Sequence, residues 1–414
     1  MSQGKLKEAL HTFTDALQKK PNFSKAHFNI GNIFKEQRDL EKAIVSYKTA
    51  IKLNPRYAEA YFNMGNALNA QGMPSAAIDA FRQAVEVNPS FAEAFFNLGN
   101  VLYDQSELEN AVAAFNRVIS IKPSHVNAQI NLGNALKKLG RLNEALTAFN
   151  KVRSIDRENA HVYYSLGNIF REMGKKKEAL ENYKKQLRYK ADDPVASHMI
   201  ASLEGKNKDT APKEYVERLF DDFANQFEKS LVSELEYQLP KVVVEMFRKN
   251  HIEGSLGAIL DLGCGTGLLG SELKNGFERL EGVDISASML KQAEDKNIYH
   301  KLYQSEITEY LSSACLDFDY IISLDVFIYV GNLSQVFQLI KSKSQRSVKF
   351  VFSTEHTEKE GFRLEKTGRF SHSKGYIQKL CREYDYKITH FSKINLRKES
   401  GEILIGGLYV LEFL

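Results

Sequence analysis

Residues 259–267, Ile-Leu-Asp-Leu-Gly-Cys-Gly-Thr-Gly, decide the fold of the C-terminal part of this chain. Apolar residues lead to an acid, three glycines alternate, and Leu268-Leu269 then begins an apolar helix. This order predicts a strand, a tight turn and a helix start. Glycines let the backbone approach a ligand because no Cβ intervenes, and the first turn of a helix offers free N–H groups. The stretch therefore predicts a ligand site at the carboxyl end of a strand.

A second predicted strand ends in Asp284, whose carboxylate can accept hydrogen bonds from both hydroxyls of a ribose. Turn and carboxylate together predict a crevice for a nucleoside-containing cofactor. Residues 265–270 also fit G-x-G-x-x-G, a pattern that is typical of dinucleotide sites but weak when it stands alone. Asp261 separates the two interpretations, because its charge would repel a pyrophosphate. It suits S-adenosyl-L-methionine, which has no phosphate and carries a cationic amino group and a sulfonium.

This part of the chain resembles the S-adenosylmethionine-dependent methyltransferases of the Rossmann-like class. The resemblance lies in residues 261–267 and in residues 282–290, Gly-Val-Asp-Ile-Ser-Ala-Ser-Met-Leu, and it covers the C-terminal third. It implies that Glu306, after the third strand, accepts the adenine amino group, although the family more often has Asp there. The other cofactor-binding residues that it implies are Asp261, Leu262, Gly263, Gly265, Gly267, Asp284 and Ile285.

Strand-like and helix-like segments alternate through this third, which predicts a parallel sheet with right-handed crossovers. Two final runs, Lys387–Ile394 and Ile403–Phe413, have Gly401 at the turn between them, so we expect them to be antiparallel. The resemblance implies an α/β Rossmann-like domain with a mostly parallel seven-stranded sheet and an antiparallel terminal hairpin, which disfavours a dehydrogenase. The other expected strands are Ala258–Asp261, Leu280–Asp284, Lys301–Gln304, Tyr320–Leu324 and Lys349–Thr354.

The composition is that of an ordinary protein with more than one domain. The 414 residues are 43% hydrophobic and 26% charged, and the net charge of +4 gives no case for nucleic acid or a membrane as partner. Three cysteines lie far apart, so we expect neither a disulfide framework nor a zinc site. No apolar run approaches a membrane span or a signal peptide, and the expected location is cytoplasmic.

The first half of the chain repeats with a period of 34 residues, which is the signature of the tetratricopeptide repeat. Each unit is expected to be two helices, in which small residues allow close crossing and an aromatic residue fills the groove. Residues 1–204 are therefore predicted to form an all-α superhelix with a partial first unit, five full units and an end helix at Val195–Leu203. The recurring residues are Gly31, Gly65, Gly99, Gly133 and Gly167, with Tyr47, Phe81, Phe115, Phe149 and Tyr183.

Asparagine occupies two positions on the first helix of most units, three residues apart and so on one face. Asparagine is a poor helix former, so this column has a cost in stability. The array resembles the repeats of O-linked N-acetylglucosamine transferase, and an amide can pair with the backbone of an extended peptide. The alternative is that these amides cap or bridge neighbouring helices within the stack. The predicted partner-binding residues are Asn29, Asn32, Asn63, Asn66, Asn97, Asn100, Asn131, Asn134 and Asn168.

Residues 205–250 are predicted to be a linker and a helical lid, followed by the methyltransferase domain at 251–414. Gly205–Pro212 is polar and ends in proline, which is typical of a linker. The following segment is similar to one in bacterial methyltransferases fused to such repeats. This similarity implies a lid in which Tyr215 and Phe223 contact the cofactor. The alternative is that the aromatic residues only pack in the core.

Methyl transfer is an in-line displacement, so the enzyme mainly aligns nucleophile and methyl group and in some cases takes a proton. Residues 323–330 are similar to the fourth motif of the family, and Asp325 and Tyr329 within it are candidates for this role, as is His356. His372 lies in a stretch that resembles one in the repeat-fused enzymes, and histidine is suited to act as a base. The alternative for His372 is a cap or loop histidine. No metal is expected.

Three functions follow from these patterns. The first is an S-adenosylmethionine-dependent methyltransferase whose repeats recruit an extended peptide or protein segment. The second is a small-molecule methyltransferase whose repeats only mediate assembly. The third is a non-catalytic scaffold, which the intact Asp261, glycines and Asp284 disfavour.

Overall fold

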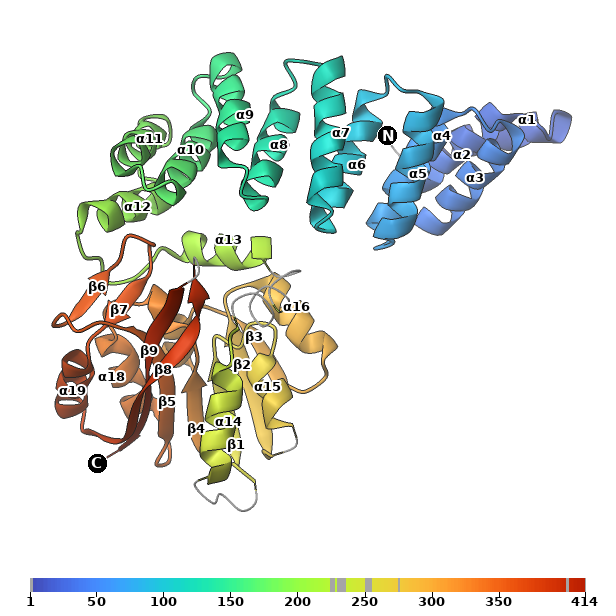
Figure 1. Cartoon of the computed structure of the whole chain (residues 1–414). Coiled ribbons are helices and arrows are strands. Elements are labelled where there is room, and N and C mark those ends of the chain that lie inside the picture. Colours follow the sequence, from blue (N-terminus) through green and yellow to red (C-terminus); the bar gives the residue numbers. More distant parts are fainter. Residues whose placement is uncertain are drawn as a thin grey trace. The chain divides into compact units, whose positions relative to one another are not determined.

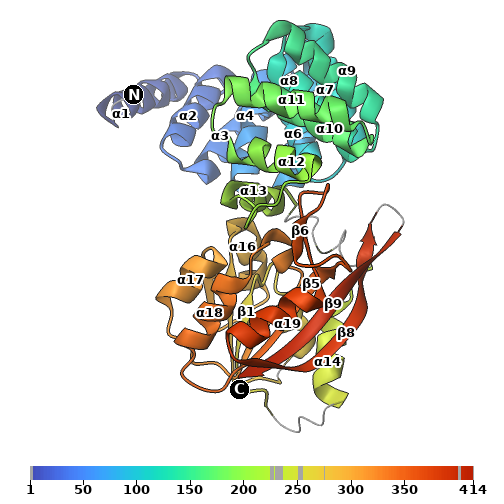
Figure 2. The same ribbon diagram turned by 90° about the vertical axis from the view of Figure 1, so that its left-hand side faces the viewer.

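The computed structural model describes residues 3–223, 228, 236–249, 255–274, 276–399 and 402–413. The chain divides into two compact units, Met1–Tyr189 and Lys190–Leu414. The described part of the first unit is built from helices, and the second unit contains a sheet with helices around it (Figures 1 and 2). No helix in the described ranges is both long and apolar enough to cross a membrane.

The helices of the first unit pack in consecutive pairs, α2 with α3 through α10 with α11 (Figure 1). The predicted array of helix pairs is confirmed. The helices are α1 (Gln3–Lys19), α2 (Ser24–Glu36), α3 (Leu40–Leu53), α4 (Ala58–Ala70), α5 (Pro74–Val87), α6 (Ala92–Asp104), α7 (Leu108–Ile121), α8 (Val126–Lys138), α9 (Leu142–Ile155), α10 (Ala160–Glu172) and α11 (Lys176–Tyr189).

The glycine of each unit lies directly against the aromatic ring of the same unit. A Cβ added to Gly99 would lie 2.6 Å from Cε1 of Phe115, and one added to Gly167 would lie 2.6 Å from Cε1 of Tyr183. The rings themselves are completely buried. The two helices of a pair therefore approach closely only because this position carries no side chain, which explains why glycine and ring recur with the same period.

The second unit is built on a mostly parallel sheet with an antiparallel terminal hairpin, as predicted. Among the described residues the sheet has nine strands, ordered β3-β2-β1-β4-β5-β7-β6, with β9 pairing with β5 and β8 pairing with β9. The strands are β1 (Ala258–Leu262), β2 (Arg279–Asp284), β3 (Lys301–Gln304), β4 (Tyr320–Ser323), β5 (Lys349–His356), β6 (Phe362–Leu364), β7 (Phe370–His372), β8 (Tyr386–Glu399) and β9 (Glu402–Phe413). Gly401, the predicted turn residue, lies outside the described residues.

Helices cover both faces of this sheet, because successive side chains on a strand point to opposite sides. Ile259 packs in a core with α14 (Leu239–Lys249) and α15 (Leu268–Leu273). Its neighbour Leu260 packs in a second core with α17 (Ile307–Ser313), α18 (Ser334–Lys343) and α19 (Lys374–Glu383). β1 is thus buried on both sides, which explains its continuous apolar sequence. The remaining helices are α12 (Pro194–Glu204), α13 (Lys213–Phe223) and α16 (Ala287–Asp295), with the short η3 (Phe327–Tyr329).

Two features of the second unit differ from what the sequence predicted. The sheet was expected to have seven strands, and the helix at Val195–Leu203 was expected to belong to the repeat array. β6 and β7 are short additional strands, and β7 pairs in parallel with the end of β5. Helix α12, expected to end the repeat array, packs within the second unit. There the Nε2–H of His198 donates to the carbonyl oxygen of Gly368 at 2.8 Å, and Ala201 joins a core with Phe370.

The predicted linker is an ordered strap, which we define as residues 206–212. The N–H of Ala211 donates to the carbonyl oxygen of Tyr329 at 2.9 Å, and the carbonyl oxygen of Asp209 accepts from two backbone N–H groups of the loop after η3. The side chain of Asn207 pairs with the backbone of β6 at 2.9 Å through both its donor and its acceptor. These contacts fix the strap beside the carboxyl end of the sheet, where it leads into α13.

Candidate active site

The turn after β1 requires glycine for two reasons. Gly263 and Gly267 have φ angles of 78° and 83°, a region that side-chain-bearing residues rarely adopt. A Cβ on Gly263 would lie 2.3 Å from Cγ2 of Val326. The turn therefore brings bare backbone to the end of β1, next to the segment that follows β4. This is the position where the strand order reverses, at which sheets of this kind form a ligand crevice.

Asp284, at the end of β2, holds the turn in place. Its Oδ2 accepts from the N–H of Gly265 at 2.8 Å, and its Oδ1 accepts from the N–H of Ser286 at 2.9 Å. Burial raises the pKa of Asp284 to about 6, although the two backbone hydrogen bonds act to lower it. The Asp284 carboxylate is thus a buried hydrogen-bond acceptor, and its charged form is less favoured than that of a carboxylate in water.

Asp261 lies on β1, two residues before Gly263, and is almost completely buried. Its Oδ2 accepts from the hydroxyl of Tyr299 at 2.7 Å. Burial raises the pKa of Asp261 to about 7, the Tyr299 hydrogen bond opposes this shift, and the charge of Asp284 adds to it. Two carboxylates with raised pKa values therefore face one cavity. A cationic ligand would favour the charged form of both.

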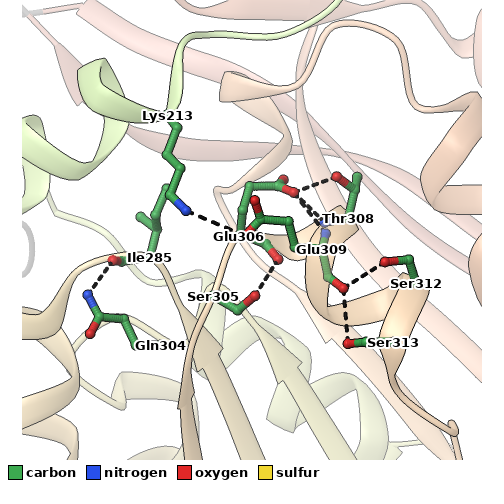
Figure 3. Close-up of polar contacts among 9 residues, drawn as sticks. All are labelled: Lys213, Ile285, Gln304, Ser305, Glu306, Thr308, Glu309, Ser312 and Ser313. Atoms are coloured by element: carbon green, nitrogen blue, oxygen red, sulfur yellow. Dashed lines mark hydrogen bonds and ion pairs between the residues drawn. The ribbon is translucent and has the colours of Figure 1, made fainter.

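Glu306 caps the start of α17 (Figure 3). Its Oε2 accepts from the N–H groups of Thr308 and Glu309 at 2.8 and 3.0 Å, and also from the Thr308 hydroxyl. Nζ of Lys213, on α13, lies 3.4 Å from Oε2 of Glu309 in the first turn of the same helix. In the described part of the chain no hydrogen bond reaches Oε1 of Glu306, so this oxygen remains an acceptor at the cavity wall.

A cavity of about 780 Å³ lies at the carboxyl ends of the strands. Of the predicted cofactor residues it brings together Asp261, Gly263, Gly265, Asp284, Ile285 and Glu306. Leu262 and Gly267 do not line it. The Leu262 side chain points into the core, because neighbouring strand residues face opposite ways.

The cavity wall also contains residues that the sequence did not identify. Asp209, Thr210 and Ala211 come from the strap, and Leu219 and Phe220 come from α13. α13 thus supplies part of the wall, but Tyr215, expected to contact the cofactor, does not line the cavity; its ring packs against His198. The side chain of Phe223 lies outside the described residues. Tyr237, Arg369 and Arg397 are among the other polar residues of the wall that the sequence did not identify.

Asp325 lies in the cavity wall after β4 and belongs to a chain of ion pairs. Nη1 of Arg397 donates to both of its carboxylate oxygens, and Nη2 of Arg397 donates to Oε1 of Glu355 at 3.0 Å. Nε of Arg369 lies 2.9 Å from the same Glu355 oxygen. Asp325 has a left-handed φ of 59°, and its N–H donates to Oγ of Ser353 at 2.8 Å. An unusual backbone conformation held on several sides is typical of functional sites.

Tyr329 also lines the cavity, whereas the two histidines do not. Burial is the main cause that raises the pKa of Tyr329, and the neighbouring Tyr215 raises it further. His372 is completely buried on β7, and its Nε2–H donates to the carbonyl oxygen of Gly331 at 2.9 Å. Burial lowers the pKa of His372 to about 4. We expected His372 to act as a base, but its burial and its bond to Gly331 indicate that it packs in the core. Nε2 of His356 lies 3.1 Å from Oε1 of Glu358.

In the first unit the asparagine column bridges neighbouring repeats. The Nδ2 groups of Asn63, Asn97 and Asn131 donate to the Oδ1 atoms of Asn32, Asn66 and Asn100, at 2.8, 2.7 and 2.8 Å. Tyrosine hydroxyls also bond to this column, because Tyr47 donates to Asn32, which is itself bridged, and Tyr183 donates to Asn168. Most asparagines of the column therefore bridge neighbouring repeats, which was the alternative to peptide binding.

Asn134 is an exception within the column. The next unit has Ser165 where the others have asparagine, and no hydrogen bond to the Asn134 amide is found in the described part of the chain. A second cavity, of about 360 Å³, is lined by Asn100, Tyr103, Asp104, Asn131 and Asn134. The Asn134 amide thus lies at this second cavity, and in the described part of the chain it forms no bridge to the next repeat.

Comparisons with known proteins agree with both halves of this description. A family model described as "Methyltransferase domain" matches residues 253–398. Models described as "TPR repeat" match residues 31–72 and 133–174, and models described as "Tetratricopeptide repeat" match residues 62–126 and 160–193. Methyltransferase-like protein 27 of Homo sapiens is 36% identical over 85 residues, and the match spans 20% of this chain and 34% of that protein.

Two solved structures show more distant similarity. YrrB, described as a TPR protein with an unusual peptide-binding site, is 26% identical, with 45% of this chain and 96% of that chain covered and a TM-score of 0.43. Magnesium protoporphyrin IX methyltransferase from Synechocystis PCC 6803, solved with bound SAM, is 18% identical, with 43% and 79% covered and a TM-score of 0.34. On its family matches and its own fold, this chain combines an array of tetratricopeptide repeats with a C-terminal methyltransferase domain.

Proposed function

We propose that the second unit is an S-adenosylmethionine-dependent methyltransferase. The observation that carries this proposal is the pair of buried carboxylates, Asp261 and Asp284, which line one cavity beside a bare-backbone turn, where a cationic ligand would favour their charged forms. Asp284 would accept the ribose hydroxyls, and Oε1 of Glu306 would accept the adenine amino group. Asp261 would balance the positive charge of the methionine part. When bound, the cofactor supplies an electrophilic methyl group on its sulfonium.

The residues beyond the turn would then orient the acceptor. Asp325 is held by Arg397 and Ser353, and Tyr329 is held through its backbone by the strap. Each thus has a fixed position from which to align a nucleophile, and Asp325 can receive a proton. α13 and the strap form part of the wall and so shield the reacting groups from water.

Direct titration tests the cofactor. Isothermal titration of the full chain with S-adenosylhomocysteine should give saturable binding, whereas NADH should give none, because Asp261 opposes a pyrophosphate at the turn. S-adenosylhomocysteine keeps the ribose, the adenine and the cationic amino group, so it tests every contact except those of the methyl group and the sulfonium charge. Binding of NADH, or no heat with S-adenosylhomocysteine, would refute the proposal.

We also propose that the first unit recruits an extended peptide or protein segment at the hollow beside Asn134. The bridged asparagines bond to one another, whereas the Asn134 amide offers a donor and an acceptor to a peptide backbone. An array of immobilised peptides would report this binding. Asn134→Ala should lower the bound signal, and Asn143→Ala, an exposed asparagine on the second helix of the same unit, should not.

The bridges predict a separate effect on stability. Asn100→Ala removes the acceptor of the Asn131 amide and should lower the free energy of unfolding by about 1 kcal/mol relative to Asn134→Ala. Asn134→Ala removes no bridge and gains helix propensity, so it should leave the stability equal or slightly higher. Urea unfolding of the two variants measures this difference. Equal stabilities would show that the bridges contribute nothing.

A further inference from the structure

Tyr299 contacts Asp261 from behind the cavity wall. It lies in the short connection between α16 and β3, and it does not itself line the cavity. Its hydroxyl donates to Oδ2 of Asp261 at 2.7 Å. In the described part of the chain no hydrogen bond reaches Oδ1 of Asp261, although Asp261 lines the cavity. Tyr299 therefore engages one carboxylate oxygen and leaves the other for a ligand.

The ring of Tyr299 packs against three glycines. A Cβ added to Gly267, Gly270 or Gly282 would lie 2.9, 3.0 or 3.0 Å from an atom of this ring. Gly267 precedes α15, Gly270 lies within α15, and Gly282 lies on β2. Carbon atoms in contact keep a separation of about 3.5 Å or more, so a side chain at any of these positions would displace the ring. The three glycines thus leave a space of the right size for Tyr299.

This packing gives the G-x-G-x-x-G pattern of residues 265–270 a different explanation from a dinucleotide site. In dinucleotide sites the last glycine allows the helix to pack closely on the strand. Here the last glycine, Gly270, lies against a tyrosine ring whose hydroxyl reaches Asp261. The pattern therefore serves to hold the carboxylate that opposes a pyrophosphate.

The other described titratable neighbours of Asp261 do not stabilise its charge. They are Asp284 on β2, Cys264 in the turn and Tyr237 before α14. Burial raises the pKa of Cys264 and of Tyr237 well above their ordinary values, so both are neutral at pH 7. The charge of Asp284 disfavours a second charge on Asp261, whereas the hydrogen bond from Tyr299 favours it. Tyr299 itself remains protonated, because burial raises its pKa as well.

We propose that Tyr299 is a positioning residue for the cofactor, whose hydroxyl fixes Oδ2 of Asp261 so that Oδ1 accepts the ammonium group of the methionine part. This inference rests on the proposed methyltransferase function and adds to it a residue that acts without touching the ligand. A hydrogen bond to a carboxylate is charge-assisted and stronger than one between neutral groups. The confined ring fixes the direction of this bond, and hence the orientation of the carboxylate.

Tyr299→Phe tests this inference, because it removes the hydroxyl and keeps the ring that fills the space between the glycines. S-adenosylhomocysteine carries the ammonium group, whereas adenosine has the same adenine and ribose without it. At pH 7 the substitution should weaken S-adenosylhomocysteine binding about tenfold, the usual loss for a hydrogen bond to a charged group. Adenosine affinity should change less than about twofold. Isothermal titration with both ligands measures this contrast, which a general disturbance of the turn would not produce.

The pH dependence gives a second readout. Without the Tyr299 hydroxyl, Asp261 should ionise only at higher pH, because the bond that favours its charged form is lost. The rise of S-adenosylhomocysteine affinity with pH should therefore shift to higher pH in Tyr299→Phe. In an Asp261→Asn background, where there is no charge to support, Tyr299→Phe should weaken binding by less than about threefold.

Tyr303→Phe is the matched control. The Tyr303 hydroxyl donates to Oε2 of Glu281 at 3.0 Å, and neither residue lines the cavity. S-adenosylhomocysteine affinity should stay within about twofold of the wild type in this variant. Unchanged S-adenosylhomocysteine affinity in a folded Tyr299→Phe, an equal loss for both ligands, or a tenfold loss in the Asp261→Asn background would overturn the inference. Each of these results would leave the proposed function intact, whereas no S-adenosylhomocysteine binding to the wild type would refute that function itself.

Discussion

Replacing Asp284 with alanine should weaken S-adenosylhomocysteine binding about 100-fold or more. The carboxylate is the proposed acceptor for the ribose hydroxyls, and it also fixes the turn through Gly265 and Ser286. Its loss therefore removes ligand contacts and leaves two buried N–H groups without their acceptor. Isothermal titration at one pH compares the variant with the wild type.

Asp295→Ala is the matched control for this experiment. Asp295 is an exposed carboxylate at the end of α16, outside the cavity, so S-adenosylhomocysteine should bind this variant as it binds the wild type. An unfolding curve of each variant shows whether the domain remains folded. A folded Asp284→Ala protein that binds within about threefold of the wild type would exclude Asp284 as a cofactor residue.

Most of the predicted cofactor residues line one cavity, because the sequence signals that predicted them are local. Asp261, the glycines and Asp284 lie in or directly after two adjacent strands, so their spacing alone brings them together at one sheet edge. Two predicted cofactor residues, Leu262 and Gly267, do not line the cavity. The alternation of strand side chains explains Leu262, which follows Asp261 and therefore faces the core.

On the other side of the cavity the sequence predicted Asp325 and Tyr329, which do line it, but the contacts around them could not be predicted in this way. Arg397 meets Asp325 across 72 residues of sequence, and no local pattern marks such a pair. The strap has the polar, proline-ending composition of a linker, but its order comes from backbone hydrogen bonds to distant loops, which composition does not reveal. β6 and β7 have three residues each, too few to show strand periodicity.

His372 and the asparagine column show a different limit. Both were recognised from residue type and family resemblance, and residue type does not report burial. In the fold, the His372 ring is enclosed and donates to Gly331, and most column amides bond to one another. The signal for bridging was present in the sequence, since asparagine recurs at two positions of the helix, and the first of these in one unit meets the second in the preceding unit, 31 residues earlier.

Replacing Asp261 with asparagine should stabilise the ligand-free protein at pH 8 while weakening its affinity for S-adenosylhomocysteine. Asparagine keeps an acceptor for Tyr299 but carries no charge. Because the pKa of Asp261 is raised to about 7 in the fold, the folded wild type binds a proton more tightly than the unfolded chain does. Its stability is therefore fully present at low pH and declines as pH rises from about 4 through 7. Asp261→Asn lacks this decline, so at pH 8 it should be more stable by about 1–4 kcal/mol.

The affinity should depend on pH in the opposite sense. A cationic amino group prefers ionised Asp261, so the wild type should bind S-adenosylhomocysteine more tightly as pH rises from about 5.5 to 8. In Asp261→Asn this increase should be much smaller, with only the Asp284 contribution left, and affinity at pH 8 should fall about tenfold or more. Thermal unfolding and titration at several pH values measure both effects, with Asp295→Asn as the surface control. If affinity proved independent of pH and of this substitution, Asp261 would not face the cationic group, and the choice of a methyl donor over a phosphate-bearing cofactor would lose its electrostatic basis.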